Sequence, residues 1–155
     1  MSDESHPFVP LTQILAGTSI RLAARASDRD DAIRQVAAAL VEAGAVDEDY
    51  ADAMLDRENS VSTYIGEGVA VPHATLAGKH AVIQDAIAVL RFPDGVEWDG
   101  NDVTVAVGIA AQGNGHIALM SQLAIVLLDG DRAHALRHAT TSEQVYAILT
   151  PDDKP

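Results

Sequence analysis

A histidine that directly follows a proline is the side chain of this sequence best placed to do chemistry. His73 comes after Gly66-Glu67-Gly68-Val69-Ala70-Val71-Pro72, where two glycines allow unusual backbone angles and an apolar run is typical of a strand. Pro72 fixes φ and cannot donate to a sheet ladder, so we expect the strand to stop there. An imidazole beyond that point lies at a mouth of the fold, where it can titrate near neutral pH and meet a partner. A hydrogen-bonded structural histidine is the alternative, and spacing alone does not separate the two.

Two further side chains could meet a charged group beside this histidine. Arg57 falls in the last turn of a helix predicted to begin at Asp47-Glu48-Asp49. The alternative for Arg57 is an ordinary partner of the negative end of the helix dipole. His116 follows Gln112-Gly113-Asn114-Gly115 and begins another predicted helix, where backbone N–H groups attract anions. A helix-capping or buried structural role is the alternative for His116.

The region around His73 fits a longer pattern. It asks for an acidic or amide residue, then an apolar and a small residue, and finally an apolar-Ala-apolar-Pro-His-small run. The positions that fill it are Glu58, Ile65, Gly66, Val69, Ala70, Val71, Pro72, His73 and Ala74. This region resembles the phosphorylation site of the enzyme IIA domains of the bacterial phosphoenolpyruvate-dependent sugar phosphotransferase system, mannitol/fructose class. Ala74 stands where many members have glycine, a change that the pattern allows.

A second resemblance supports the first. Val107-Gly108-Ile109-Ala110-Ala111, a short loop and then His116-Ile117 resemble the strand-to-helix loop that carries the family's second active-site histidine, with the mannitol type closest. Similar segments also occur at 54–57, 92–96 and 139–142. The resemblance therefore covers nearly the whole chain after about Leu11.

The resemblance implies a phosphotransferase component that acts as a phosphocarrier. The carrier HPr would donate a phosphoryl group to Nε2 of His73, and His73 would pass it to a cysteine of the EIIB domain of a permease. His116 and Arg57 would complete the catalytic set by meeting the charge that spreads over the transferring oxygens. Mannitol or fructose-like uptake is implied, with no cofactor, no metal and no direct sugar binding by this domain. Nitrogen-related members share the phosphorylated histidine, so a regulatory signalling module is an alternative.

A metal-dependent hydrolase is an alternative from another class. His73, His80 and His116 with one carboxylate could hold a catalytic zinc ion, because such sites use three protein ligands and a water. His134 and His138 are four residues apart and share a helical face. We expect a solvated helix face there, since no third ligand of the usual kind is evident.

Composition limits the classes of partner. The chain has 155 residues, which suits one domain, and a net charge of −13, which repels phosphate backbones and anionic lipid. We therefore expect neither nucleic acid nor a membrane surface as a partner. The sequence has no cysteine, no apolar run of membrane-spanning length and a polar start unlike a signal peptide. These features favour a soluble cytoplasmic protein.

The pattern of apolar residues predicts a single-domain α/β sandwich with a small mixed sheet of four or five strands flanked by helices. A flexible arm at 1–10, a domain at 11–150 and a tail at 151–155 are expected. Strands are predicted at 19–22, 69–71, 82–92 and 103–111. The turn signal Pro93-Asp94-Gly95 suggests an antiparallel pair.

Helix signals complete the expected architecture. One helix is predicted to open at Ser27, with Asp30 as an approximate capping box, and to end at Gly44. The helix that begins at His116 is apolar almost all round, so we expect it to be well buried. Thr141 and Gln144 are spaced as a capping box for the last helix. The remaining helices are predicted at 47–57, 132–138 and 142–149.

Overall fold

The computed structural model describes residues 10–74, 76–112 and 115–150. Most of the expected arm and all of the expected tail lie outside these residues. The elements in chain order are η1 (Leu11–Ile14), β1 (Leu15–Arg21), α1 (Arg29–Glu42), α2 (Tyr50–Ser60), β2 (Tyr64–Gly66), β3 (Val69–Ala70), η2 (Leu76–Ala81), β4 (Ala86–Trp98), β5 (Asn101–Ala110), α3 (Gly115–Leu127), α4 (Gly130–Arg137) and α5 (Ser142–Leu149).

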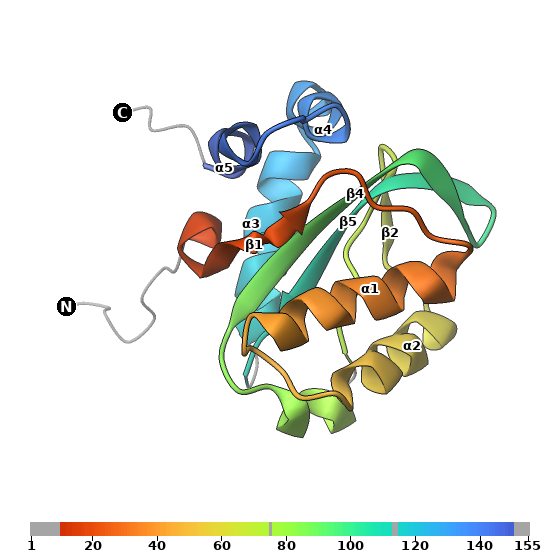
Figure 1. Ribbon diagram of the computed structural model, residues 1–155, viewed down its shortest axis with the longest axis vertical. Helices are drawn as coiled ribbons and strands as arrows, with labels where there is room; N and C mark the ends of the chain where they lie inside the picture. Colours follow the sequence, from red (N-terminus) through yellow and green to blue (C-terminus); the bar gives the residue numbers. More distant parts are fainter. Residues whose placement is uncertain (1–9, 75, 113–114, 151–155) are drawn as a thin grey trace.

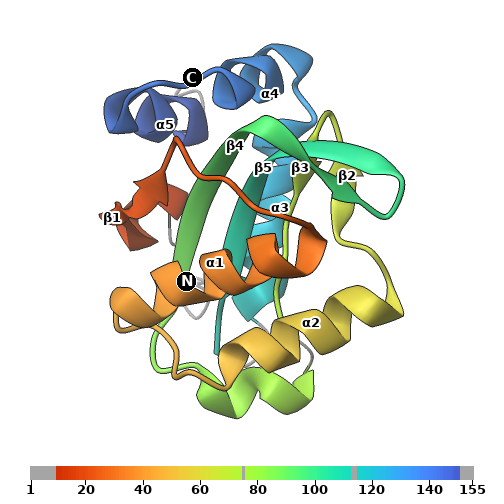
Figure 2. The same ribbon diagram turned by 45° about the vertical axis from the view of Figure 1, so that its right-hand side comes forward.

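One five-stranded mixed sheet lies at the centre of the fold, in the order β1-β4-β5-β3-β2. The long central strands β4 and β5 are antiparallel, β1 is parallel to β4 and β3 is parallel to β5. Helices α1 and α2 cover one face, α3 covers the other, and α4 and α5 lie at one end (Figures 1 and 2). The predicted single α/β sandwich is confirmed.

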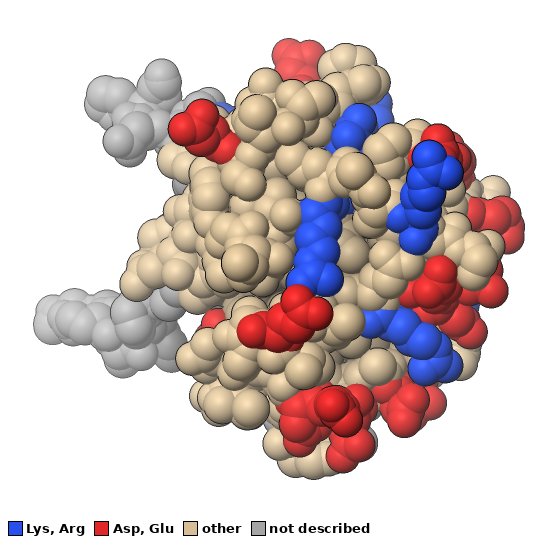
Figure 3. Space-filling view, viewed as in Figure 1, with Lys and Arg blue, Asp and Glu red and all other residues tan. Residues whose placement is uncertain are grey.

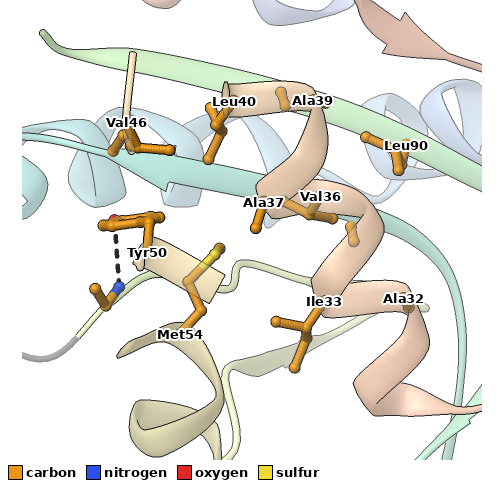
Figure 4. Close-up of a cluster of buried hydrophobic side chains, with 14 of the residues drawn as sticks. Ala32, Ile33, Val36, Ala37, Ala39, Leu40, Val46, Tyr50, Met54 and Leu90 are labelled. Atoms are coloured by element: carbon orange, nitrogen blue, oxygen red, sulfur yellow. Dashed lines mark hydrogen bonds between the residues drawn. The ribbon is translucent and has the colours of Figure 1, made fainter. Parts of the chain in front are cut away.

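The central strands are buried on both faces because helices cover both sides of the sheet. Toward α1 the strands carry small residues as well as large ones, so the helix packs close to the sheet. A Cβ at Gly108 would overlap the side chain of Val36 on α1. Figure 4 shows part of this cluster, with Val36, Leu40, Tyr50 and Met54 gathered beside the sheet. Ile87, Val89 and Val107 face the opposite cluster, under α3.

The predicted turn at Pro93-Asp94-Gly95 is wrong. These residues lie inside β4, where Arg91 pairs with Val105 but Val96 pairs with Val103, so the strand bulges between them. The chain reverses instead at Asp99-Gly100, whose φ angles of 53° and 91° suit a tight hairpin turn. Gly95, with a φ of 79°, accommodates the bulge and lets β4 run on to Trp98.

The first helix begins slightly later than predicted. Asp28, rather than Ser27, is the N-cap residue of α1, and its side chain accepts from the backbone N–H of Asp31. The carboxylate of Asp31 in turn accepts from the backbone N–H of Ser27, which lowers the pKa of Asp31. The helix ends before Gly44, as expected, where φ is 79°. The capping box of Thr141 and Gln144 on α5 is confirmed.

The expectation that α3 is well buried is wrong. One face of the helix packs under the sheet through Leu119 and Leu123. The opposite face carries Ile117 and Ile125, which are 58% and 74% exposed, and Leu128, directly after the helix, is 69% exposed. Because the sheet covers only one side of α3, the remaining apolar side chains reach solvent. Among the described residues, no helix is long and apolar enough to cross a membrane.

Candidate functional site

A tight hairpin turn sets the direction of the strand that leads to His73. Strand β2 turns into β3 through Glu67 and Gly68, whose φ angles are 56° and 75°. The carbonyl of Gly68 accepts from the backbone N–H of Thr104, at 2.9 Å, which ties the turn to β5. Arg137 of α4 donates to the carbonyl of Glu67 at 2.6 Å. The positive φ of a non-glycine residue is thus held from outside the turn.

Strand β3 stops at the proline, as predicted. Val69 and Ala70 pair with β5, whereas Pro72 has no N–H to donate. The carbonyl of Pro72 still accepts from the N–H of Ile109 at 3.0 Å, so the chain stays beside β5 as it leaves the sheet. His73 follows at this point and is 5% exposed. The imidazole therefore lies in a fixed, largely buried position just beyond the end of strand β3.

One ring nitrogen of His73 has a backbone partner. Nδ1 lies 2.9 Å from the carbonyl oxygen of Val71. A carbonyl can only accept, so Nδ1 carries the proton, and in the neutral ring the lone pair is on Nε2. The carbonyl of Val71 is the acceptor for the second ring nitrogen that the sequence did not identify.

His73 and Arg57 line the same open pocket, which has a volume of about 480 Å³. The structure therefore brings together two of the three predicted site residues from separate parts of the chain. Arg57 lies in the last turn of α2, half-buried, and its Nη1 donates to the carbonyl of Val61 at 2.6 Å. The other residues that line the pocket come from α3 and are Ile117, Met120, Ser121 and Ala124.

The contribution of α3 to this pocket was missed at the level of sequence. Ile117, Met120, Ser121 and Ala124 recur at helical spacing, so they form one stripe along α3. A helical projection of the segment would have shown that this stripe begins next to His116. Ser121 adds a hydroxyl to the stripe, and Met120 and Ala124 also line a neighbouring apolar hollow of about 160 Å³ with Leu128.

A buried carboxyl group anchors the segment that carries Arg57. Glu58 is 2% exposed, and its oxygens accept from the backbone N–H of Thr63 at 2.6 Å and from the Thr63 hydroxyl at 2.8 Å. The indole Nε1 of Trp98 donates to the same carboxyl group at 2.9 Å. Glu58 therefore joins the end of α2, the loop before β2 and the end of β4. Because Glu58 directly follows Arg57, these bonds hold the backbone at the end of Arg57 in place.

The backbone of His116 lies in the first turn of α3, where it was predicted, but its side chain is outside what the structure describes. Earlier in the chain, the backbone N–H of Gln112 donates to the carboxylate of Asp85 at 2.9 Å. The next residue, Ile117, lines the pocket of His73. The expected contact between His116 and a group on His73 stays a prediction.

The other candidate histidines do not line this pocket. His80 is exposed in η2. His134 is exposed on α4, and His138, the C-cap residue of that helix, is exposed with its ring centroid 4.4 Å from that of His134. The solvated face expected for the α4 pair is confirmed. Within residues 10–74, 76–112 and 115–150, no three histidine or acidic side chains gather as metal ligands. Nothing in the described part of the chain supports the zinc hypothesis.

The charge around the molecule is uneven. On the face formed by α1 and α2, acidic side chains outnumber basic ones in the lower part of the view (Figure 3). The net charge of the chain is −13, yet the pocket of His73 is lined by the positively charged side chain of Arg57. A localised cation beside a buried imidazole suits a transferring anion better than it suits a long polyanion.

The chain matches a family model described as the phosphoenolpyruvate-dependent sugar phosphotransferase system, EIIA 2, over residues 13–151. It is 47% identical over 126 residues, or 81% of this chain, to a multiphosphoryl transfer protein of Escherichia coli O157:H7. The alignment covers 34% of that protein, so the chain spans about a third of its length. A mannitol-specific phosphotransferase enzyme IIA component of Halalkalibacterium halodurans is 37% identical over 88% of this chain and 94% of its own.

Solved structures share the fold. The crystal structure of IIA mannitol from Escherichia coli aligns with a TM-score of 0.81 and 34% identity, over 87% of this chain and 98% of its own. The IIA chain in the complex of enzyme IIA mannitol with phosphorylated enzyme IIB mannitol, also from E. coli, aligns with a TM-score of 0.81 and 33% identity, over 86% and 95%. A nitrogen regulatory protein IIA from Neisseria meningitidis aligns at 0.79 with 26% identity, over 90% and 98%.

Proposed function

Because this chain belongs to the EIIA 2 family of the phosphoenolpyruvate-dependent sugar phosphotransferase system, we propose that it is a phosphocarrier whose Nε2 of His73 accepts and passes on a phosphoryl group. The observation that carries this proposal is the hydrogen bond from Nδ1 to the carbonyl of Val71 in a pocket that also holds Arg57. It fixes the ring orientation and leaves the lone pair on the nitrogen that must attack. Residues 11–150 form the phosphocarrier domain in this proposal.

The transfer needs two displacements at phosphorus. In the first, the lone pair of Nε2 attacks the phosphorus of phospho-HPr, and the bond from phosphorus to the HPr histidine breaks with its electron pair staying on that ring. The proton on Nδ1 of His73 stays on that nitrogen throughout, hydrogen-bonded to the carbonyl of Val71. In the second, the thiolate of the EIIB cysteine attacks the same phosphorus, and Nε2 leaves. A phosphoimidazole suits this role because it keeps the group reactive enough to move on.

Arg57 meets the charge that develops during both steps. A guanidinium has five N–H donors, and the carbonyl of Val61 takes one of them. The others can approach phosphoryl oxygens from the α2 side of the pocket. In this proposal His116, at the start of α3, serves the same oxygens from the other side with the help of nearby backbone N–H groups.

The exposed apolar face of α3 supports protein partners rather than a small sugar. Ile117, Met120 and Leu128 surround the pocket and its neighbouring hollow, and both are open to solvent on one side. Contiguous exposed apolar side chains beside a reactive group are typical of a docking surface. HPr and an EIIB domain would dock here in turn, each bringing its own reactive side chain over Nε2 of His73. A cytoplasmic location follows from these partners.

The similarity favours a mannitol-type role. The mannitol-specific relatives of Halalkalibacterium halodurans and Staphylococcus aureus are 37% and 34% identical to this chain over most of their length. The nitrogen regulatory structure is 26% identical, and one mannitol-specific cryptic IIA structure of E. coli is 22% identical. A fructose-like substrate of the permease and a regulatory role are the alternatives. All of these roles use the same phosphorylated histidine, so the identity of the EIIB partner distinguishes them.

Phosphate labelling tests the proposal. The purified protein is incubated with labelled phosphoenolpyruvate, enzyme I and HPr, and acid-labile, base-stable label is counted before and after addition of an EIIB domain of the mannitol type. His73→Ala should fold and take up no label, because the nucleophile has no substitute. His116→Ala should still be labelled, about a hundredfold more slowly, as for the loss of one electrostatic donor. His134→Ala, on the exposed face of α4, is the matched control and should label normally.

Two results would contradict this assignment. Full labelling of His73→Ala would show that another residue is the acceptor. Complete loss of label in His116→Ala, with His73 present, would mean that the roles of the two histidines are reversed. Label that forms but never leaves for an EIIB domain of the mannitol or fructose type would favour the regulatory alternative.

A further inference from the structure

We propose that Tyr50 is a positioning residue for His73: its hydroxyl group fastens the chain just after the histidine to the end of β5. The inference rests on the proposed function of His73 as phosphoryl acceptor, and it names a residue of α2 that lies outside the set formed by His73, His116 and Arg57. Tyr50 is the first residue of α2 and is 2% exposed.

The chain on both sides of His73 is tied to the same residue of β5. Before the histidine, the carbonyl of Pro72 accepts from the N–H of Ile109 at 3.0 Å. After it, the N–H of Ala74 donates to the hydroxyl of Tyr50 at 3.4 Å, and that hydroxyl donates to the carbonyl of Ile109 at 2.6 Å. Figure 4 shows the bond from a backbone nitrogen to the Tyr50 hydroxyl. Through Tyr50, the backbone after His73 is held to Ile109, as the backbone before it is through Pro72.

The hydroxyl group of Tyr50, rather than its ring, makes this link between Ala74 and Ile109. The ring of Tyr50 packs in the apolar cluster between α1, α2 and the sheet, a place that phenylalanine would fill equally well. A buried hydroxyl without partners is costly, so its presence in this cluster is explained by the two backbone groups that it joins. It must donate and accept at once, which requires the protonated form. Burial raises the pKa of Tyr50 to about 12, so the group stays protonated at neutral pH.

Loss of the two hydrogen bonds of the Tyr50 hydroxyl should lower the rate of phosphoryl transfer. The ring of His73 is held by Val71 through Nδ1, and its backbone is held by Pro72 and Ala74. With phenylalanine at position 50, the N–H of Ala74 and the carbonyl of Ile109 lose their shared partner, and the residue that carries Nε2 can shift. Because displacement at phosphorus needs alignment of the reacting atoms, a small shift lowers the rate. Tyr50 is buried away from the docking surface, so binding of HPr should not change.

Tyr146 provides a matched control. Its hydroxyl also donates to a backbone carbonyl at 2.6 Å, that of Leu15, but it joins α5 to β1. Tyr50→Phe and Tyr146→Phe thus each remove one hydroxyl that is bonded to a backbone carbonyl. Both should lower the urea midpoint moderately. Only Tyr50→Phe should slow the labelling of His73, with kcat reduced roughly tenfold or more and KM for HPr within about twofold.

Hydrogen exchange of the Ala74 amide is the second readout, and it does not depend on phosphoryl transfer. Relative to the change in global stability, Tyr50→Phe should raise the exchange rate of this amide, whereas Tyr146→Phe should not. Equal kcat values for the two variants, or an Ala74 amide that exchanges equally in both, would overturn the inference. If the unsubstituted protein takes no label from phospho-HPr, the proposed function fails, and the Ala74 amide still decides the role of Tyr50.

Discussion

The carboxyl group of Glu58 offers a sharp test of how the site is held. Three donors converge on it: the backbone N–H and the hydroxyl of Thr63, and the indole N–H of Trp98. Glu58→Ala removes the acceptor of all three inside a position that is 2% exposed. Glu58→Gln keeps one oxygen for the two N–H donors and turns its amide toward the Thr63 hydroxyl, which can rotate to accept. The two substitutions should therefore differ strongly.

The expected difference can be worked out from these contacts. A buried donor left without a partner costs about 1–3 kcal/mol, so the two N–H donors cost about 4 kcal/mol in Glu58→Ala if the Thr63 hydroxyl finds another orientation. Glu58→Gln keeps a partner for each donor and should cost about 1 kcal/mol, mainly for weaker neutral bonds. With a urea m-value of about 2 kcal/mol per molar, the midpoints should differ by roughly 1.5 M.

Urea denaturation followed by tryptophan fluorescence is a suitable assay, because Trp98 is the single tryptophan and contacts the group that changes. Glu42→Ala is the matched control, since Glu42 bonds Arg21 at 2.6 Å but its side chain is 65% exposed. This control should lose less than about 1 kcal/mol. If Glu58→Ala and Glu58→Gln agree within about 0.5 kcal/mol, the convergence of three donors does not stabilise the fold and the reasoning is wrong.

Three other predictions concern packing, ionisation and docking. Gly108→Ala should lower the free energy of unfolding, measured in urea, by roughly 1–3 kcal/mol, because the new Cβ overlaps Val36. Gly17→Ala, with open space around the new Cβ, should not lower it, and equal losses in the two variants would contradict the packing described for Gly108. Tyr50 stabilises the fold fully below its unfolded pKa of about 10, and roughly 2–3 kcal/mol should be lost as pH rises toward about 12. When the free energy of unfolding is measured over the same pH range, Tyr50→Phe should not show this loss. Leu128→Ser, on the 69% exposed rim, should raise KM for HPr about five- to thirtyfold with little change in kcat; an unchanged KM would place docking elsewhere.

Local signals in the sequence were reliable where neighbouring residues alone decide the conformation. Pro72 ended its strand, Gly44 followed the end of α1, and Thr141 capped α5, because each depends on a fixed φ or on bonds within one turn. The hairpin turn was placed wrongly because two dipeptides, Asp94-Gly95 and Asp99-Gly100, carry the same local signal. Pairing with β5 decided between them, and that pairing is a contact between strands.

The sequence by itself determined the family, the mixed α/β architecture and the choice of His73, since these follow from residue types at short spacings. Tertiary structure alone showed that Arg57 shares a pocket with His73, that Val71 holds Nδ1 and that Tyr50 joins Ala74 to Ile109. It also showed that one face of α3 is exposed, although the helix is apolar almost all round. The physical reason is that burial and hydrogen-bond partners depend on which elements lie against each other in the fold. Residues on separate elements acquire these relations only when the sheet and its helices are assembled.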